Sequence, residues 1–286
     1  MSKHPLVIIG GNSLIAPWLM QRLRAEGRTA DVVSRTKAHV PEGFRFTAMD
    51  LGSARNWIAP ENAIVVSLLP LWTLVRYMPR FIGVHSIIAT GSTSRFSKTI
   101  SNDAKERAIA ANLEIAEHAL EEWCVKSNVH RTLLRPTLIY DGMRDQNIAR
   151  MARFIRRFHF LPIAAPAKGL RQPIHADDVA KAIMKAMDNE AAHGKSFNVA
   201  GGEVLTYRAM AERVFAGLGL KPRFLALPVT WLSRAFRVAS KTGLVRESSF
   251  GSSIFERMNQ DLIFDVEEGL RVLSYQPRGF HPEFHG

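Results

Sequence analysis

The sequence predicts an α/β fold: a doubly wound parallel sheet with a smaller C-terminal lobe packed on it. Short apolar segments rich in β-branched residues alternate with amphipathic segments from the start of the 286-residue chain. Glycines follow the first apolar segment directly, and the alternation loosens after about residue 137. These observations predict one continuous globular unit with two regions, residues 1–142 and 143–286.

The expected strands are short, and those at residues 63–68 and 85–89 are apolar and rich in β-branched residues. Strands of a parallel sheet have near-continuous apolar sequences because helices cover both faces. The expected strands lie at residues 5–9, 29–33, 44–48, 63–68, 85–89, 131–134 and 196–199. Their order, with helices between them, favours a single parallel sheet.

The expected helices carry apolar residues at helical spacing. In the first one, Leu14, Trp18, Leu19 and Leu23 fall on one face. A long helix rich in Ala, Glu and Leu is predicted over residues 102–126. Further helices are expected at residues 72–81, 147–158, 176–187, 207–216 and 228–241, and the tail at 280–286 is expected to be irregular.

Cysteine content and hydropathy bear on the compartment. Cys124 is the one cysteine, so no intramolecular disulfide can form, which fits a reducing compartment. The N-terminus lacks the features of a secretory signal, and no apolar stretch approaches the roughly 18 residues of a membrane span. We therefore expect a soluble, cytoplasmic protein.

The net charge of +12 and the pI near 10.2 are compatible with three kinds of partner. These are nucleic acid, an anionic membrane surface and anionic small molecules. Lys and Arg are spread along the chain, and the sequence has neither a recognition-helix motif nor an RNP-like aromatic strand, so we expect no nucleic-acid partner. The ten histidines show no metal-ligand spacing, so no metal site is expected.

The turn after the first strand has the features of a dinucleotide site. Small residues at Gly10, Ser13 and Ala16 permit a tight turn, close approach of the backbone to a pyrophosphate, and a helix N-terminus aimed at it. The expected cofactor-binding residues of this Rossmann-type turn are Gly10, Gly11, Asn12, Ser13, Leu14 and Ile15. The alternative is a glycine-rich turn that only caps the helix, with Asn12 or Ser13 as N-cap.

Two further positions bear on the cofactor. An acidic residue at the end of the second strand would bind the ribose 2′-hydroxyl of NAD, whereas Arg accommodates the 2′-phosphate of NADP. Here Ser34 and Arg35 stand at that position, which favours NADP over NAD. A solvent-facing basic turn is the alternative. Asp50 and Leu51, after the third strand, are expected to meet the adenine.

Several ordered segments resemble the extended short-chain dehydrogenase/reductase family, which includes the NAD-dependent nucleotide-sugar epimerases and dehydratases. They are LLRPTLIY at residues 133–140, RQPIHADDVA at 171–180, FNV at 197–199 and GGE at 201–203. Together with the glycine turn they extend the resemblance from about Leu6 to Tyr207. Their common order makes the resemblance specific.

The resemblance implies a cleft between the two regions, in which a nucleotide sugar lies across the nicotinamide. Arg171 would contact the substrate diphosphate, because a guanidinium can bind two phosphate oxygens at once. Asn147, at the start of a helix, would touch the sugar nucleotide. We expect His175 and Asp178 to be structural, with Asp178 as a cap of the following helix.

The chemistry of this family depends on a Ser or Thr and on a Tyr-x-x-x-Lys pair, in which the lysine lowers the pKa of the tyrosine. Ser92 or Thr93, after the fifth strand, fits the first position. The pair is absent, since no tyrosine occurs between Tyr77 and Tyr140. Alignment on the long helix places Ile109 and Leu113, or with a shift of one residue Ala108 and Asn112, where the family has Tyr and Lys.

The main hypothesis is an NAD(P)-binding, epimerase/dehydratase-like oxidoreductase that acts on a nucleotide sugar or a related phosphorylated metabolite. Tyr140 and Lys105 are the candidates for a replacement acid/base, and hydride placement without one is a further option. The alternative is a non-catalytic NADP(H)-binding regulator or assembly subunit. A third hypothesis is a peripheral membrane protein, suggested by aromatic and basic residues in 229–245, although an amphipathic helix that faces the core is the favoured interpretation of this segment. A homodimer is also considered.

Overall fold

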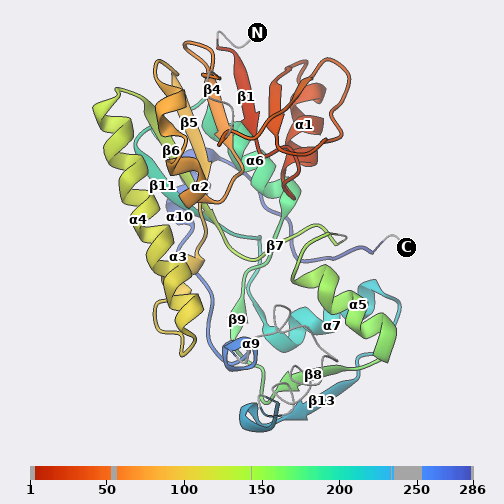
Figure 1. Cartoon of the computed structure of the whole chain (residues 1–286). Coiled ribbons are helices and arrows are strands. Elements are labelled where there is room, and N and C mark those ends of the chain that lie inside the picture. Colours follow the sequence, from red (N-terminus) through yellow and green to blue (C-terminus); the bar gives the residue numbers. More distant parts are fainter. Residues whose placement is uncertain (1–3, 53–56, 143, 233, 235–252, 285–286) are drawn as a thin grey trace.

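A computed structural model describes residues 4–52, 57–142, 144–232, 234 and 253–284 (Figure 1). Its centre is a seven-stranded sheet in the order β11-β6-β5-β4-β1-β2-β3, with every neighbouring pair parallel. The strands are β1 (Leu6–Ile9), β2 (Asp31–Ser34), β3 (Arg45–Ala48), β4 (Ile64–Ser67), β5 (Ser86–Thr90), β6 (His130–Pro136) and β11 (Lys195–Val199). The predicted doubly wound α/β fold is confirmed.

Helices cover both faces of this sheet, which explains its apolar strands. In β1, Leu6 and Ile8 face one core cluster, and Val7 and Ile9 face another. The first cluster lies under α1 and α6, and the second under α2 and α4 (Figure 1). The bounds of these helices are α1 (Ala16–Ala25), α2 (Leu71–Val75), α4 (Ala104–Lys126) and α6 (Ala176–Met187).

Proline stands at the boundaries of two helices. The helix expected over 72–81 is interrupted, because α2 ends at Val75 and a 3₁₀ turn follows at Met78–Phe81. Pro79 has no amide hydrogen to donate back to Val75, and its ring would clash with that carbonyl. At α1, the helix begins at Ala16 with Pro17 in its first turn, where a missing donor is tolerated.

The C-terminal lobe has its own apolar cluster, below the sheet in Figure 1. Its regular elements are α5 (Ile148–Phe158), β8 (Leu161–Ala164), α7 (Tyr207–Gly217), β13 (Phe224–Leu227) and α9 (Ser253–Arg257). Short strand pairs connect the lobe to the sheet: β7 (Ile139–Tyr140) with β10 (Ile174–His175), and β9 (Leu170–Arg171) with β12 (Leu205–Thr206). Of the helix expected at 228–241, residues 229–232 are helical, and most of the rest lies outside the described residues.

The proposed division at residue 142 does not separate the sheet layers from the C-terminal lobe. Both β11 and α6 belong to the second region, yet β11 forms one edge of the large sheet and α6 packs against α1. The remaining short elements are α3 (Ser94–Ser97), a 3₁₀ turn at Glu190–Ala192 and α10 (Glu267–Leu273). No helix within the described ranges is long and apolar enough to span a membrane.

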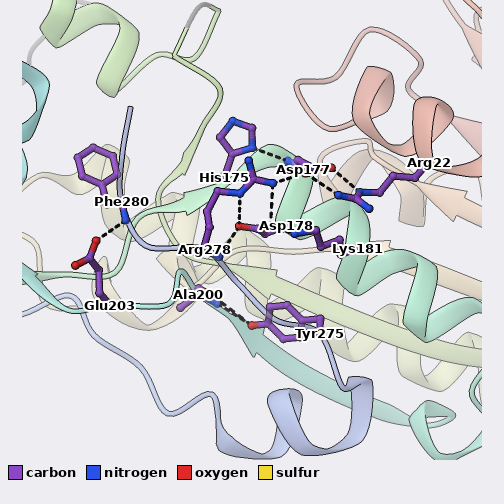
Figure 2. A network of polar contacts seen from close by, with 10 residues as sticks. All are labelled: Arg22, His175, Asp177, Asp178, Lys181, Ala200, Glu203, Tyr275, Arg278 and Phe280. Atoms are coloured by element: carbon purple, nitrogen blue, oxygen red, sulfur yellow. Dashed lines mark hydrogen bonds and ion pairs between the residues drawn. The ribbon is translucent and has the colours of Figure 1, made fainter. Parts of the chain in front are cut away.

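A buried acidic pair holds the C-terminal segment against the sheet layers (Figure 2). Asp178 is fully buried and accepts hydrogen bonds from the Arg278 amide and Nε, both at 3.0 Å, and from Lys181 Nζ at 2.7 Å. Asp177 binds Arg22, with Nη2 at 2.7 Å, and Arg278. Burial alone would raise the pKa of Asp177, but the two guanidinium groups outweigh burial and hold it below its ordinary value.

Glycines let the same C-terminal segment run close to the rest of the chain. The Gly202 amide donates to the Arg278 carbonyl at 2.9 Å, and a Cβ at Gly202 would lie 2.6 Å from the Pro277 oxygen. At Gly142, which has φ +76°, a Cβ would lie 2.3 Å from the carbonyl oxygen of Glu283. Residues 280–284 form no regular element, as expected.

Four histidines form a row along the amino-terminal edge of the sheet, which is the edge opposite the first turn. The ring centroids of His4 and His85 lie 4.1 Å apart, those of His85 and His130 5.4 Å, and those of His130 and His193 4.2 Å. Burial and the neighbouring imidazoles lower the pKa of His85 and of His193, while Glu190 opposes this effect. Among the described residues, no group of three or more His, Cys, Asp or Glu side chains could hold a metal ion.

The histidine row predicts a loss of stability in mild acid. A depressed pKa means that the unfolded chain binds the proton more readily, so stability is complete above the unfolded pKa of about 6.5 and falls as the pH drops below it. Urea unfolding at about pH 7.5 and about pH 5.5 should show a lower midpoint at the acidic pH. In His85→Asn/His193→Asn the difference should shrink, and an equal difference in the variant would refute the role of the row.

Candidate functional site

The turn after β1 needs glycine at both of its first positions. Gly10 has φ +95°, a left-handed conformation, and a Cβ there would lie 3.2 Å from the carbonyl carbon of Leu68. A Cβ at Gly11 would lie 2.6 Å from Cγ1 of Val32. The first glycine thus sets the turn, and the second allows it to pack directly on β2.

The remaining turn residues divide into backbone and side-chain contributors. Ile15 is buried in the core and Leu14 is half-buried, so these two residues can bind a ligand only through their backbone groups. The N-cap position of helix α1 is Ile15, whose side chain makes no cap hydrogen bond, and of the two expected caps Asn12 binds the end of β2 whereas Ser13 binds the start of the helix. Ser13 Oγ does accept the Ala16 amide at 3.1 Å.

Asn12 ties the turn to the end of β2. Its amide nitrogen donates to Ser34 Oγ at 3.2 Å and to the carbonyl and Oγ1 of Thr36, both at 2.8 Å. The Gly10 amide donates to the Val33 carbonyl at 2.9 Å. Arg35 lies on this bend with an exposed side chain. The turn and the expected cofactor selector are therefore one connected structure, at the carboxyl edge of the sheet where α/β folds bind nucleotides.

Ser67 and the pair Asp50 and Leu51 also lie at this edge, and they differ in their exposure. Ser67, the last residue of β4, is fully buried, and within the described part of the chain its hydroxyl has no hydrogen-bond partner. Asp50 is exposed and accepts the Gly52 amide at 2.9 Å. Leu51 is only 4% exposed and belongs to the core. The expectation that its side chain meets the adenine is therefore corrected, because the side chain packs under the sheet.

Of the two hydroxyl groups expected after β5, only that of Ser92 is accessible at this edge of the sheet. Thr93 is 5% exposed and donates from Oγ1 to the Pro136 carbonyl at 3.3 Å, so its expected catalytic role is corrected to a structural one. Ser92 is half-buried, and its Oγ accepts the Ser94 amide at 3.1 Å. An accepting hydroxyl keeps its own hydrogen free to donate.

Helix α4 carries no acid/base pair at the aligned positions. Leu113 is buried and Ile109 is half-buried, and both pack in the cluster under the sheet. In the shifted register, Ala108 and Asn112 are exposed. Lys105 is exposed in the first turn of the helix.

The buried face of α4 carries two glutamates that sequence reasoning missed. Glu117 is 6% exposed and accepts two hydrogen bonds from Arg135, at 2.9 Å and 2.7 Å, and one from Arg95. Glu106 is 7% exposed and contacts Arg257 at 2.7 Å and Ser101 at 2.7 Å. Their helical spacing with buried Ala110 and Leu113 was the signal available in the sequence. Because Arg95 lies in α3, Glu117 helps to fix the segment that carries Ser92.

Tyr140 does not lie at the mouth of a cleft, which corrects its assignment as a replacement acid/base. Its side chain is 1% exposed and lies between the edges of His175 and Phe280, at centroid distances of 5.1 Å and 4.9 Å. Burial raises the pKa of Tyr140 to about 12. A phenol in this environment stays protonated near neutral pH and is shielded from substrate.

Arg171 binds backbone rather than facing a cleft. It is 4% exposed, and its guanidinium donates to the carbonyls of Leu170 and Gln260, both at 2.7 Å, and of Arg257. Burial lowers the pKa of Arg171 to about 10. The expected contact with a substrate diphosphate is therefore corrected: this arginine anchors the segment around Gln260.

The segment before α5 is better placed for an anionic ligand. Arg144 is half-exposed and donates from Nη2 to the carbonyl of Leu14 at 3.4 Å, so this segment lies beside the first turn. Asn147 is exposed at the start of α5. By contrast, a surface hollow of about 390 Å³ beside α3 has no basic side chain to bind a diphosphate; it is lined by Phe96, Ser97, Ile100, Gln260, Asp261, Leu262 and Phe264.

His175 and Asp178 are both structural, but the helix cap expected of Asp178 is His175. His175, and not Asp178, caps α6, because its Nδ1 accepts the Asp177 amide at 3.1 Å. Burial and the nearby Arg278 lower the pKa of His175, which favours the neutral ring that this acceptor role requires. Asp178 binds Arg278 and Lys181 instead.

Comparison with known families agrees with this geometry. The model of the NAD dependent epimerase/dehydratase family matches residues 47–200, which is over half of the chain. The chain belongs to this family, and the resemblance stated from its motifs is confirmed.

Two curated relatives match parts of the chain. One is the mitochondrial NADH dehydrogenase [ubiquinone] 1 alpha subcomplex subunit 9 of Arabidopsis thaliana, 29% identical over 114 residues, or 40% of this chain. The other is the UDP-glucose 4-epimerase of Vibrio cholerae, 23% identical over 202 residues, or 69% of this chain. The matches span 28% and 58% of these relatives' own lengths.

Solved structures share the fold over almost the whole chain. A UDP-glucose 4-epimerase of Thermotoga maritima with UDP-glucose has a TM-score of 0.68 at 16% identity, covering 98% of this chain and 95% of its own. MoeE5 in complex with UDP-glucuronic acid and NAD has a TM-score of 0.71 at 18% identity, with the same coverage. A UDP-glucose 4-epimerase of Thermus thermophilus in complex with NAD has a TM-score of 0.69 at 15% identity, covering 97% of this chain and 96% of its own.

Proposed function

We propose that this protein is an NADP(H)-binding, epimerase/dehydratase-like oxidoreductase that acts on a nucleotide sugar or a related phosphorylated metabolite. Family membership and the UDP-glucose 4-epimerase relative support the reaction class. The observation that carries the proposal is the connected edge formed by Gly10, Asn12 and Ser34, with Arg35 exposed on the same bend. These residues fit a dinucleotide: the turn offers backbone amides to a pyrophosphate, and the buried Ser67 hydroxyl remains available for a hydrogen bond.

The preference for NADP follows from the end of β2. Residues 34–37 are Ser, Arg, Thr and Lys, so no carboxylate stands where the ribose 2′-hydroxyl of NAD would be bound. Arg35 would bind the 2′-phosphate through its guanidinium, and Ser34 would donate a further hydrogen bond. Asp50 remains the proposed contact to the adenine.

Titration with NADPH and with NADH, followed by fluorescence or calorimetry, tests the cofactor proposal. We expect the wild type to prefer NADPH. Arg35→Gln should lower NADPH affinity roughly tenfold to hundredfold, the loss of one charge-assisted phosphate contact, and should leave NADH affinity unchanged. Arg24→Gln, which removes the same charge from an exposed position on α1, is the control. Equal binding of the two nucleotides by the wild type would contradict the proposal.

For the substrate, we propose that Arg144 and Asn147 take the role first expected of Arg171. Both lie in the segment next to the first turn, and Arg144 is half-exposed whereas Arg171 is buried. Thermal-shift measurements with UDP-, GDP- and dTDP-sugars test this assignment. We expect Arg144→Gln to remove any shift. A shift that survives in Arg144→Gln would place the substrate elsewhere.

Proton transfer is proposed to involve Ser92 and water, since the pair on α4 is missing and Tyr140 is buried. Loss of a positioned acid/base costs on the order of 10²- to 10⁴-fold in rate, so turnover should be slow. Ser92→Ala should lower this residual rate, while Tyr140→Phe should leave it unchanged.

The second candidate is a non-catalytic NADP(H)-binding regulator or assembly subunit. The apolar side chains of Ile109 and Leu113 and the burial of Tyr140 favour it, as does similarity to a subunit of an NADH dehydrogenase. Product analysis and the absorbance of reduced nicotinamide separate the two candidates. Tight NADPH binding with no product from any nucleotide sugar would favour the second.

A further inference from the structure

Acidic residues are missing from two long stretches of the sequence. Residues 146–176 and residues 213–246 contain no Asp or Glu, while they contain six and seven Lys or Arg. The whole chain has 38 basic and 26 acidic residues, so the remainder is close to neutral. The basic residues are spread along the chain, but the net charge of +12 arises in these two stretches.

The fold brings the described parts of the two stretches, which are residues 146–176, 213–232 and 234, together in the C-terminal lobe. Strand β8, from the first stretch, pairs in parallel with β13, from the second, with Leu161 opposite Phe224. The Leu161 amide donates to the Arg223 carbonyl at 2.9 Å. Figure 1 shows α5, β8 and β13 at the end of the molecule away from the large sheet. The described basic residues of the two stretches therefore lie in this part of the molecule.

Helix α5 presents basic and aromatic side chains outward. Its inner face is buried in the lobe, while Arg153, Arg156 and Arg157 are exposed and Phe158 is 47% exposed. The Arg157 guanidinium lies 5.4 Å from the centre of the Phe158 ring. The rings of Phe154, Phe158 and Phe160 cluster at centroid distances between 4.6 Å and 6.4 Å.

The second stretch adds residues of the same kinds. Arg223 is exposed, Leu225 in β13 is 47% exposed, and Trp231 in the helical segment 229–232 is 67% exposed. We call the exposed side chains of Arg157, Phe158, Arg223, Leu225 and Trp231 the acid-free surface. Large apolar side chains between basic ones are typical of surfaces that lie in the headgroup region of a membrane.

The acids that flank these stretches in the sequence compensate only part of the charge. Asp145 is 3% exposed and accepts the Asn147 and Ala149 amides at the start of α5. Glu212 pairs with Arg208, and Glu203 pairs with Arg213. Neither Arg157 nor Arg223 forms an ion pair with a described residue, so the acid-free surface keeps a net positive charge.

We propose that the acid-free surface binds the anionic phospholipid surface of a membrane, as a peripheral contact. Charge complementarity supplies attraction, at roughly fivefold in affinity for each basic residue near the lipid surface. Phe158, Leu225 and Trp231 supply apolar groups that a nucleic-acid phosphate backbone would not use. This inference is independent of the proposed cofactor and reaction.

Flotation of the full chain with vesicles tests the inference. At near-physiological salt we expect binding to vesicles of phosphatidylcholine with phosphatidylglycerol and no binding to pure phosphatidylcholine. Arg157→Gln/Arg223→Gln should weaken binding roughly 25-fold, and Trp231→Ser should weaken it further. Arg24→Gln/Lys185→Gln, which removes two exposed charges from α1 and α6, is the matched control and should bind like the wild type. All variants should keep the thermal midpoint of the wild type.

Three outcomes would overturn the inference. The first is absence of binding to anionic vesicles, and the second is an equal loss in the α1/α6 control. The third is displacement from vesicles by duplex DNA at equal phosphate concentration, with tighter binding to DNA than to lipid. The third outcome would reassign the surface to nucleic acid.

Discussion

Glu117→Ala should lower the free energy of unfolding by about 3–5 kcal/mol, the cost typical of removing one partner from a buried ion pair. Arg95 and Arg135 both bind this carboxylate, and their side chains are only 19% and 14% exposed. Without Glu117, two guanidinium groups would remain in a largely buried place without their shared counter-ion. Urea or guanidinium denaturation would measure the loss directly.

Glu114 on the same helix provides the matched control. It pairs with the same Arg95 at 3.3 Å, but its side chain is 56% exposed. Glu114→Ala should therefore cost less than about 1 kcal/mol, as exposed ion pairs usually do. Similar losses of unfolding free energy in both variants would show that burial does not determine how much Glu117 stabilises the protein. Because Arg95 lies in α3, we also expect Glu117→Ala to weaken any effect of Ser92 on turnover.

Asp178→Ala should lower the free energy of unfolding by about 3 kcal/mol, near the low end of the range for buried pairs. The carboxylate is fully buried and accepts hydrogen bonds from the Arg278 backbone and side chain and from Lys181. The loss is limited because the Arg278 side chain is 40% exposed and keeps Asp177 as a partner. Denaturation at neutral pH measures this change.

The C-terminal segment gives this variant a second readout. Hydrogen exchange around residues 275–280 should accelerate in Asp178→Ala, because Asp178 anchors Arg278 there. Glu212→Ala, which removes an exposed carboxylate paired with Arg208, is the control and should change neither stability nor exchange by much. Unchanged exchange in Asp178→Ala would contradict the anchoring role.

The sequence by itself determined the layers of the fold, the first turn and the family. Apolar runs identified the strands because a sheet covered on both faces needs apolar residues at nearly every position. Gly10 was identifiable because a left-handed turn between β1 and α1 demands glycine. The absence of the Tyr-x-x-x-Lys pair could also be predicted, since no tyrosine occurs between Tyr77 and Tyr140.

Only the tertiary structure decided which polar side chains reach the carboxyl edge of the sheet. Tyr140, Thr93 and Arg171 fit their motifs, yet packing from distant segments buries each of them: Phe280 covers Tyr140, and the Gln260 carbonyl binds Arg171. Solvent exposure depends on contacts between residues far apart in the chain, and local sequence patterns carry no information on such contacts. For the same reason, only the pairing of β8 with β13 shows that parts of the two stretches without acidic residues lie side by side.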